Sequence, residues 1–73
     1  MKLNIRDVIK LEDNNEYAVA SVATLNDVVY YYLIDLNKDD NIKFGYLEDD
    51  NFINVEDKDL IKQLLPLFNI LNN

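Results

Sequence analysis

The chain has 73 residues, of which 14 are acidic and 7 basic, and its net charge of −7 comes with neither cysteine nor histidine. This length predicts one domain near the lower limit for burying a hydrophobic core. The missing residue types exclude a disulfide framework, thiolate or imidazole metal sites and the usual nucleophile relays. The acidic charge and the scattered Lys and Arg oppose direct binding to nucleic acid or anionic membranes.

The N-terminal ten residues place Lys2, Arg6 and Asp7 among their apolar positions. They therefore lack the uninterrupted apolar core of a signal peptide or a transmembrane helix. Together with the absence of cysteine, this predicts a soluble cytoplasmic protein with no membrane contact.

Short apolar runs alternate with clusters of Asp, Glu and Asn along most of the chain. Because the chain has one glycine, Gly45, and one proline, Pro66, we expect Asn and Asp to make the turns. The β-branched and aromatic content of the apolar runs favours strands. The predicted strands cover about residues 3–11, 17–25, 28–36, 42–47 and 52–55.

The last segment predicts a helix over about residues 58–71. Asp57 is a suitable N-cap, Leu60 and Leu64 recur at helical spacing, and Pro66 predicts a kink or break near Leu65. The chain as a whole therefore predicts a single α+β domain. Its architecture is an antiparallel four- to five-stranded β-meander, open or curled like a small barrel, with one C-terminal helix packed on it.

Three turns set the expected register: a tight turn at Asn26-Asp27 and loops over residues 37–41 and 13–15. The pairs that follow include Leu11 with Tyr17, Ile9 with Val19, Tyr17 with Leu36, Val19 with Ile34, Ser21 with Tyr32, and Ala23 with Tyr30. With these pairs, the apolar residues form one continuous face, which is the predicted core. That face contains Ile5, Ile9, Leu11, Tyr17, Val19, Tyr30, Tyr32, Ile34, Leu36, Ile42, Phe44 and Tyr46.

The opposite face of the expected sheet is unusually apolar for a face in contact with water. One interpretation is that curling of the sheet or the C-terminal tail covers it. The other is a contact surface for a partner protein or for a second copy of the chain. The candidate interface residues are Val8, Ala20, Val22, Tyr31, Leu33 and Leu47.

The acidic clusters predict solvated turns rather than a catalytic or metal site. From Asp35 onward the spacing partly matches a calcium-binding loop, but Asp40 replaces the required glycine and Tyr46 the bidentate glutamate. Successive tyrosines at 30–32 point to alternate faces, so they do not form a stacking platform for nucleic acid. We therefore expect no enzymatic activity, no catalytic residues, no cofactor and no bound metal.

The leading functional hypothesis is a non-catalytic protein-interaction module, cytoplasmic or phage-borne, that uses the apolar face to bind a partner protein or itself. The alternative is an acidic mimic of nucleic acid that inhibits a nucleic-acid-binding enzyme. Strong salt sensitivity of partner binding would favour mimicry. The candidate mimic residues are Glu12, Asp13, Glu16, Asp39, Asp40, Glu48, Asp49 and Asp50.

Three segments also carry a resemblance: residues 8–19 with their Leu-Glu-Asp-Asn-Asn-Glu-Tyr run, the apolar run 30–34, and residues 52–57. In this order they resemble small acidic proteins of unknown function from low-GC Gram-positive bacteria. The resemblance implies a hairpin, a second apolar strand pair and a terminal helix, and it implies no activity or site residues.

Overall fold

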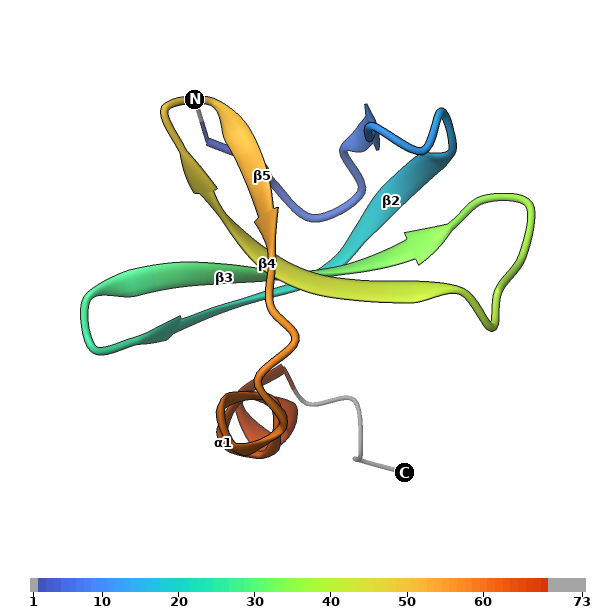
Figure 1. Ribbon diagram of the computed structural model, residues 1–73. Helices are drawn as coiled ribbons and strands as arrows, with labels where there is room; N and C mark the ends of the chain where they lie inside the picture. The colour runs from blue at the N-terminus through green and yellow to red at the C-terminus, as the bar shows by residue number, and fades with distance from the viewer. Residues whose placement is uncertain (1, 69–73) are drawn as a thin grey trace.

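In the computed structural model, which describes residues 2–68, the chain forms one five-stranded antiparallel sheet and one C-terminal helix (Figure 1). The strand order β1-β2-β3-β4-β5 follows the sequence, and the sheet curls into a half-barrel. This confirms the predicted α+β meander with a terminal helix. The first strand is much shorter than the predicted 3–11. The elements are β1 (Val8–Lys10), β2 (Glu16–Leu25), β3 (Val28–Asp35), β4 (Ile42–Glu48), β5 (Asn51–Asn54) and α1 (Lys58–Phe68).

Two hairpins turn tightly on pairs of polar residues in the left-handed backbone region. Asn26 and Asp27 have φ angles of 52° and 66° between β2 and β3, and Asp49 and Asp50 have 50° and 67° between β4 and β5. Two successive positive φ angles match the right-handed twist of the flanking strands, and Asn and Asp adopt them at lower cost than most residues. The tight turn predicted at Asn26-Asp27 is confirmed.

The register between β2 and β3 shifts at a β-bulge between Val19 and Ser21. On the hairpin side of the bulge, the predicted pairing of Ala23 with Tyr30 is confirmed. Beyond it the prediction is wrong, because Val19 pairs with Leu33 and Tyr17 with Asp35. One extra residue in β2 reverses the parity of its side chains. Tyr17 and Val19 therefore join the face that carries Tyr31 and Leu33.

The first hairpin also differs from its predicted register. Ile9 pairs with Tyr17, and Lys10 pairs with Glu16, so the predicted Leu11–Tyr17 and Ile9–Val19 pairs are wrong. The loop includes Leu11, whose N–H donates to the Asn15 carbonyl oxygen at 3.1 Å. The predicted loop would have set Glu12 opposite Glu16, whereas the observed one sets a lysine there. Opposite charges across a strand pair are favourable and like charges are not.

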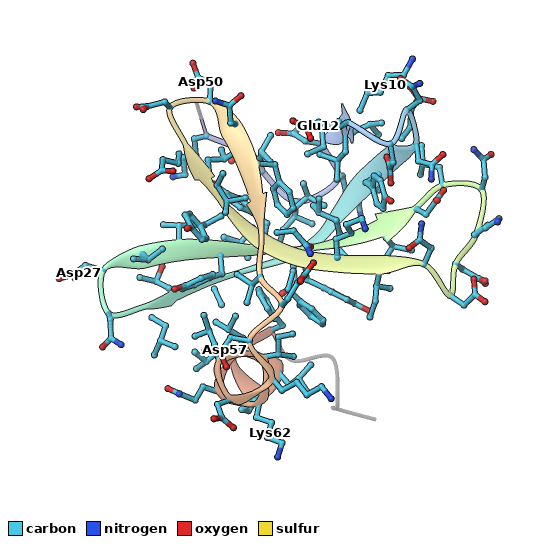
Figure 2. All side chains as sticks on the ribbon, in the orientation of Figure 1. Lys10, Glu12, Asp27, Asp50, Asp57 and Lys62 are labelled. Carbon is cyan, nitrogen blue, oxygen red and sulfur yellow. The ribbon has the colours of Figure 1, made fainter. Side chains whose placement is uncertain are left out.

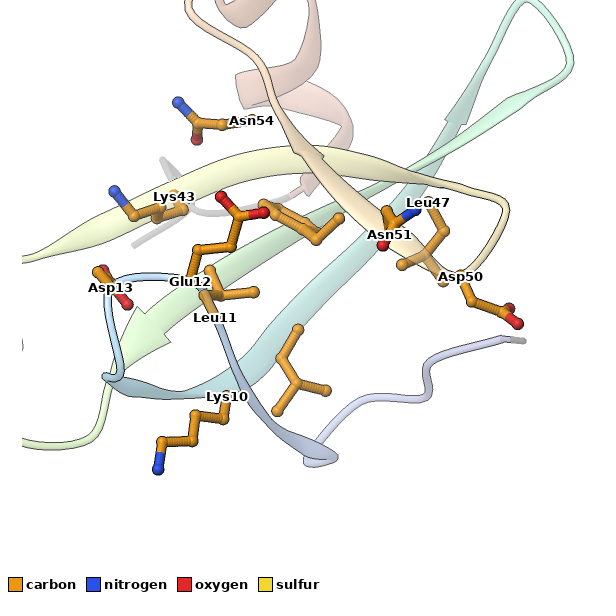
Figure 3. Close-up of a pocket in the computed structure, with 11 residues that line it drawn as sticks. Lys10, Leu11, Glu12, Asp13, Lys43, Leu47, Asp50, Asn51 and Asn54 are labelled. Carbon is orange, nitrogen blue, oxygen red and sulfur yellow. The ribbon is translucent and has the colours of Figure 1, made fainter.

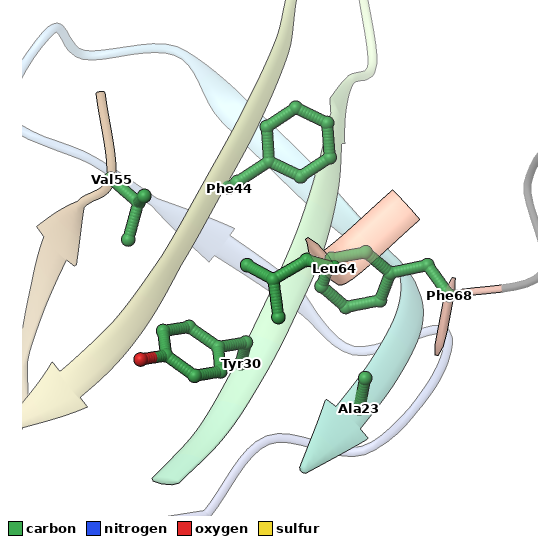
Figure 4. Packing of buried hydrophobic residues seen from close by; sticks show 6 residues of the cluster. All are labelled: Ala23, Tyr30, Phe44, Val55, Leu64 and Phe68. Carbon is green, nitrogen blue, oxygen red and sulfur yellow. The ribbon is translucent and has the colours of Figure 1, made fainter. Parts of the chain in front are cut away.

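One face of the sheet, the helix-side face, packs against α1. Leu64 and Phe68 of the helix are buried against Tyr30 and Phe44 of the sheet (Figure 4). Asp57 caps α1 as predicted, since its carboxylate accepts from the N–H of Asp59 at 2.9 Å. The helix continues through Pro66 to Phe68, so the predicted break does not occur, and the predicted 69–71 lies outside the described residues.

The other face, the inner face, lies inside the curl of the sheet. Its buried residues are Tyr17, Val19, Tyr31 and Leu33, and Leu3 of the N-terminal segment packs among them. The predicted single core face is therefore wrong, because the bulge divides its members between two faces. Three predicted core residues are exposed instead: Ile5, Leu36 and Ile42 have exposed fractions of 58%, 53% and 39%.

The single glycine sits where β5 crosses close over β4. A Cβ atom placed on Gly45 would lie 2.7 Å from Cε2 of Phe52 and would also meet the Ile53 carbonyl oxygen. Only a residue without a side chain leaves room for the Phe52 ring there. Gly45 therefore lets β5 fold inward, and this curl brings β5 into the same half of the molecule as β1 (Figure 1).

Candidate functional site

The predicted apolar interface does not form a free surface. Tyr31 and Leu33, at its centre, are 3% and 0% exposed, because the N-terminal segment and the curl of the sheet cover the inner face. Val22 and Leu47 are half-buried, whereas Val8 and Ala20 are exposed. Of the two interpretations of the apolar face, the structure therefore supports burial under the curl at Tyr31 and Leu33.

The curl instead leaves a groove between the two terminal strands of the sheet, called the seam groove below (Figure 3). Its volume is about 390 Å³. One wall comes from β1 and the loop after it, and the other from β4 and β5. The lining residues are Ile9, Lys10, Leu11, Glu12, Asp13, Lys43, Leu47, Asp50, Asn51, Phe52 and Asn54.

The floor of the seam groove is apolar and its rim is charged. Ile9, Leu11, Leu47 and Phe52 are half-buried and pack against the inner-face core, so their remaining exposed surface faces the groove. Carboxylates and lysines stand at the rim (Figure 3). An apolar base with a few polar groups around it is the usual composition of a binding site.

The β5 wall presents unpaired backbone. The N–H of Val55, just after the strand, donates to the carbonyl oxygen of Phe44 at 2.7 Å, so the backbone of Val55 is directed toward β4. Since backbone groups alternate in direction along an antiparallel edge, Ile53 and Asn51 also face β4. The N–H and C=O groups of Phe52 and Asn54 are therefore directed outward, where no strand of the described chain pairs with them.

The β1 wall has the same property. The Asp7 carbonyl oxygen accepts from the N–H of Val19 at 2.8 Å, and the N–H of Leu11 donates to Asn15 at 3.1 Å. By the same alternation, the backbone groups of Val8 and Lys10 are directed away from β2. Two edge strands with unpaired backbone thus border one groove.

A polar network holds together the first loop, between β1 and β2, and the third loop, between β3 and β4, at one end of the groove. The Tyr17 hydroxyl donates to the Asp13 carboxylate at 2.6 Å and accepts from the Asn41 side chain at 3.1 Å. Asn41 also donates to the buried Asp35 at 2.9 Å, and Asp35 accepts from the N–H of Asn37 at 2.8 Å. Every buried side-chain nitrogen or oxygen in residues 2–68 has a partner, so this cluster is satisfied.

These hydrogen bonds shift three pKa values. The bond from Tyr17, followed by the bond from the Asn15 N–H, lowers the pKa of Asp13. The bond from the Asn37 N–H, followed by that from Asn41, lowers the pKa of Asp35. Burial, and then the bond to Asp13, raises the pKa of Tyr17. At neutral pH both carboxyl groups are therefore ionised and the phenol is neutral.

All the candidate mimic residues are exposed, and they lie in three loops or at the strand ends beside them. Figure 2 shows Glu12 and Asp50 on the side of the sheet away from α1, and both residues line the seam groove. The hydrogen bonds of Tyr17 and Asn41 join the loop between β1 and β2 to the loop between β3 and β4, and five of these carboxylates lie in or next to these two loops. Those five are Glu12, Asp13, Glu16, Asp39 and Asp40. Within residues 2–68 no three acidic side chains come close enough together to hold a metal ion.

Comparison with protein-family models, with curated proteins and with solved structures gives no match. The resemblance to small acidic bacterial proteins therefore stays a prediction. No helix in the described part of the chain has the length and apolar character needed to cross a membrane.

The seam groove is the main feature that the sequence did not predict. A lone glycine inside a strand pattern, which indicates close approach of another segment, was the available signal.

Proposed function

We propose that this protein is a non-catalytic protein-interaction module and that the seam groove is its docking site. The observation that carries the proposal is the combination of an apolar floor with two bordering strand edges whose backbone groups are unpaired. Native proteins usually blunt or cover such edges, because they accept strands from other chains. Here the edges are short but face the same apolar groove.

The chemistry of the groove supports binding rather than catalysis. The sequence has no histidine or cysteine, and carboxylates would have to supply both an acid and a base. A catalytic acid needs a raised pKa to stay protonated at neutral pH. The carboxyl with a shifted pKa on the groove, Asp13, has a lowered one, as does its neighbour Asp35.

Site-specific crosslinking tests this proposal. A photoreactive amino acid replaces Asn54 on the groove rim, and the matched control places it at Gln63 on the exposed side of α1. In the native host, we expect one defined crosslinked protein from position 54 and none from position 63. The same adducts from both positions, or none from position 54, would contradict docking in the groove.

Acidic mimicry of nucleic acid is the second candidate function. The observation that favours it is the joining of the first and third loops, which gathers carboxylates at one end of the molecule. Asp39→Asn together with Asp40→Asn removes two of these charges at residues that do not line the seam groove. If mimicry operates, this double variant and added salt will both weaken partner binding strongly. If the groove is the docking site, the double variant will bind almost as tightly as the unmodified chain.

A further inference from the structure

We infer, on the basis of the proposed function, that the seam groove receives an extended segment of the partner protein as an added β-strand. The segment pairs with the outer edge of β5, places apolar side chains at alternate positions, and carries Lys or Arg among its polar positions. The β5 backbone, the apolar floor and the net charge of the chain each give one of these features.

The unpaired backbone of β5 determines the conformation of the ligand. Phe52 and Asn54 each offer one N–H and one C=O outward, two residues apart along the strand. In an extended strand this spacing is about 6.6 Å, and an extended polypeptide repeats the complementary donors and acceptors at the same interval. Addition of a strand to a free sheet edge is an established way of recognising peptides. A helical or compact ligand cannot match this repeat.

The size of the groove determines the length of the segment. β5 has four residues, which in an extended strand span about 13 Å. The cavity of about 390 Å³ is at the small end of the range for ligand sites. The contact therefore involves about four residues of the partner, and β5 is favoured over β1, which has only three.

The floor determines which partner side chains are apolar. Phe52 points into the groove, and its neighbours on the floor are Leu11 and Leu47. Opposed residues of an antiparallel pair place their side chains on the same face of the sheet. Partner side chains on the inner side therefore contact this apolar floor, whereas the alternate ones point to solvent. A segment with strict apolar and polar alternation fits both environments.

The charge of the chain determines the sign of the polar residues in the partner segment. At one end of the groove, Lys10 and Lys43 accompany Glu12 and Asp13. At the other end, three exposed acidic residues stand in succession at positions 48–50. Because the chain carries a net charge of −7, Lys or Arg at the polar positions of the partner segment is favoured and steers association.

Synthetic octapeptides test the inference on the full chain. One set alternates Ile, Val or Tyr with Lys or Ser, and a second set has the same composition in blocked order. We expect the alternating set alone to bind and to slow hydrogen exchange at the amides of Phe52 and Asn54 about tenfold or more. The amide of Ile53, already directed toward β4, serves as the internal control. Equal binding by the blocked set, or no binding by either, would overturn the inference.

A proline variant tests the backbone pairing directly. Asn54→Pro removes an outward N–H, a position at which an edge strand tolerates proline, whereas Asn54→Ala removes only the side chain. We expect binding of the alternating peptides to weaken about tenfold in Asn54→Pro and to persist in Asn54→Ala. Alternate N-methylation of the peptide gives the same test on unmodified protein, should Asn54→Pro fail to fold.

The two proposals fail separately. If position 54 still crosslinks one host protein while no peptide protects Phe52 and Asn54, the groove is a docking site but not a strand acceptor. If position 54 gives no specific adduct, the proposed function itself fails. Equal peptide binding by Asn54→Pro and Asn54→Ala overturns strand addition, whatever the crosslinking shows.

Discussion

The two faces of the sheet are covered by different means. On the helix-side face, α1 seals the core with aromatic rings: Phe68 lies 5.9 Å from both Tyr32 and Phe44, measured between ring centroids. On the inner face, two tyrosines form hydrogen bonds through their hydroxyl groups. Tyr31 accepts from the N–H of Leu3 at 3.3 Å, and Tyr17 joins the polar network.

This difference explains why a site can form on one face and not on the other. On the helix-side face, the amphipathic helix packs Leu64 and Phe68 into the core cluster of the sheet. Within residues 2–68, the inner face is closed by the curl and by a short N-terminal segment, and this closure ends where β1 and β5 do not pair. The seam groove is thus the part of the inner face that the curl and the N-terminal segment leave uncovered.

The largest effect expected is on the buried centre of the inner face. Leu33 is 0% exposed, so Leu33→Asp places an unpaired charge in the core and should destabilise the fold by about 4 kcal/mol or more. Leu36→Asp is the control, because Leu36 is 53% exposed, and it should change stability by less than about 0.5 kcal/mol. Urea denaturation measures both. A stable, folded Leu33→Asp variant would mean that the inner face is open.

The next largest effect concerns the curl that separates the two faces. Gly45→Ala places a Cβ against the Phe52 ring and the Ile53 carbonyl, and we expect a loss of about 2 kcal/mol. Adding Phe52→Leu should recover part of this loss, since the ring is one of the two obstacles. A Gly45→Ala variant as stable as the unmodified chain would show that β5 is free to move away from β4.

A smaller effect tests whether tyrosines on the inner face depend on their hydroxyl groups. Tyr17→Phe removes bonds to Asp13 and Asn41 and should cost about 1 to 2 kcal/mol. Tyr46→Phe is the matched control on the helix-side face, where Tyr46 makes an edge contact with the ring of Tyr30, and it should cost less than about 0.5 kcal/mol. Equal losses in thermal unfolding would remove this contrast between the faces.

Local patterns in the sequence were sufficient for much of the fold. The period-two runs predicted β2 to β4, the Asn26-Asp27 pair predicted a tight turn, and Asp57 predicted the helix cap, because each depends on residues close in sequence. The bulge near Ala20 could not be predicted in this way. Residues 18–21 are all small or β-branched, so either parity of β2 gives a similar pattern of apolar positions.

The candidate site depends on the β-bulge, which the sequence did not predict. Once the bulge reverses the parity of β2, Tyr17 and Val19 fill the inner face, and Tyr31 and Leu33 become core rather than interface. The groove then arises from the approach of two strands that are distant in sequence, which side-chain alternation does not encode. Gly45 carried the one local signal of that approach.

The dependence of stability on pH distinguishes the faces further. Because the pKa values of Asp13 and Asp35 are lowered in the folded state, their stabilisation is present above the ordinary pKa of 3.8 and is lost as pH falls below it. The raised pKa of Tyr17 gives stabilisation below 10.0 that is lost as pH rises above it. Urea midpoints measured from about pH 2.5 to about pH 11 should fall at both ends of this range, because it extends beyond the ordinary pKa values of Asp and Tyr. Tyr17→Phe should flatten the alkaline decline, and an unchanged decline would contradict this assignment.

The smallest effect compares the two tight hairpins, one at the end of β2 and β3 and one beside the seam groove. Asp27 and Asp50 hold φ angles of 66° and 67°, which glycine adopts without steric cost. Asp27→Gly should stabilise the fold by about 0.5 kcal/mol, because relief of the left-handed strain outweighs the greater entropy of the unfolded chain. Asp50→Gly relieves the same strain but also removes a charge beside the groove, so it alone should weaken binding of the lysine-bearing alternating peptides, by about twofold to fivefold. Equal peptide affinity of the two variants would mean that the acidic turn takes no part in recognition, and it would leave the apolar floor and the β5 backbone as the determinants.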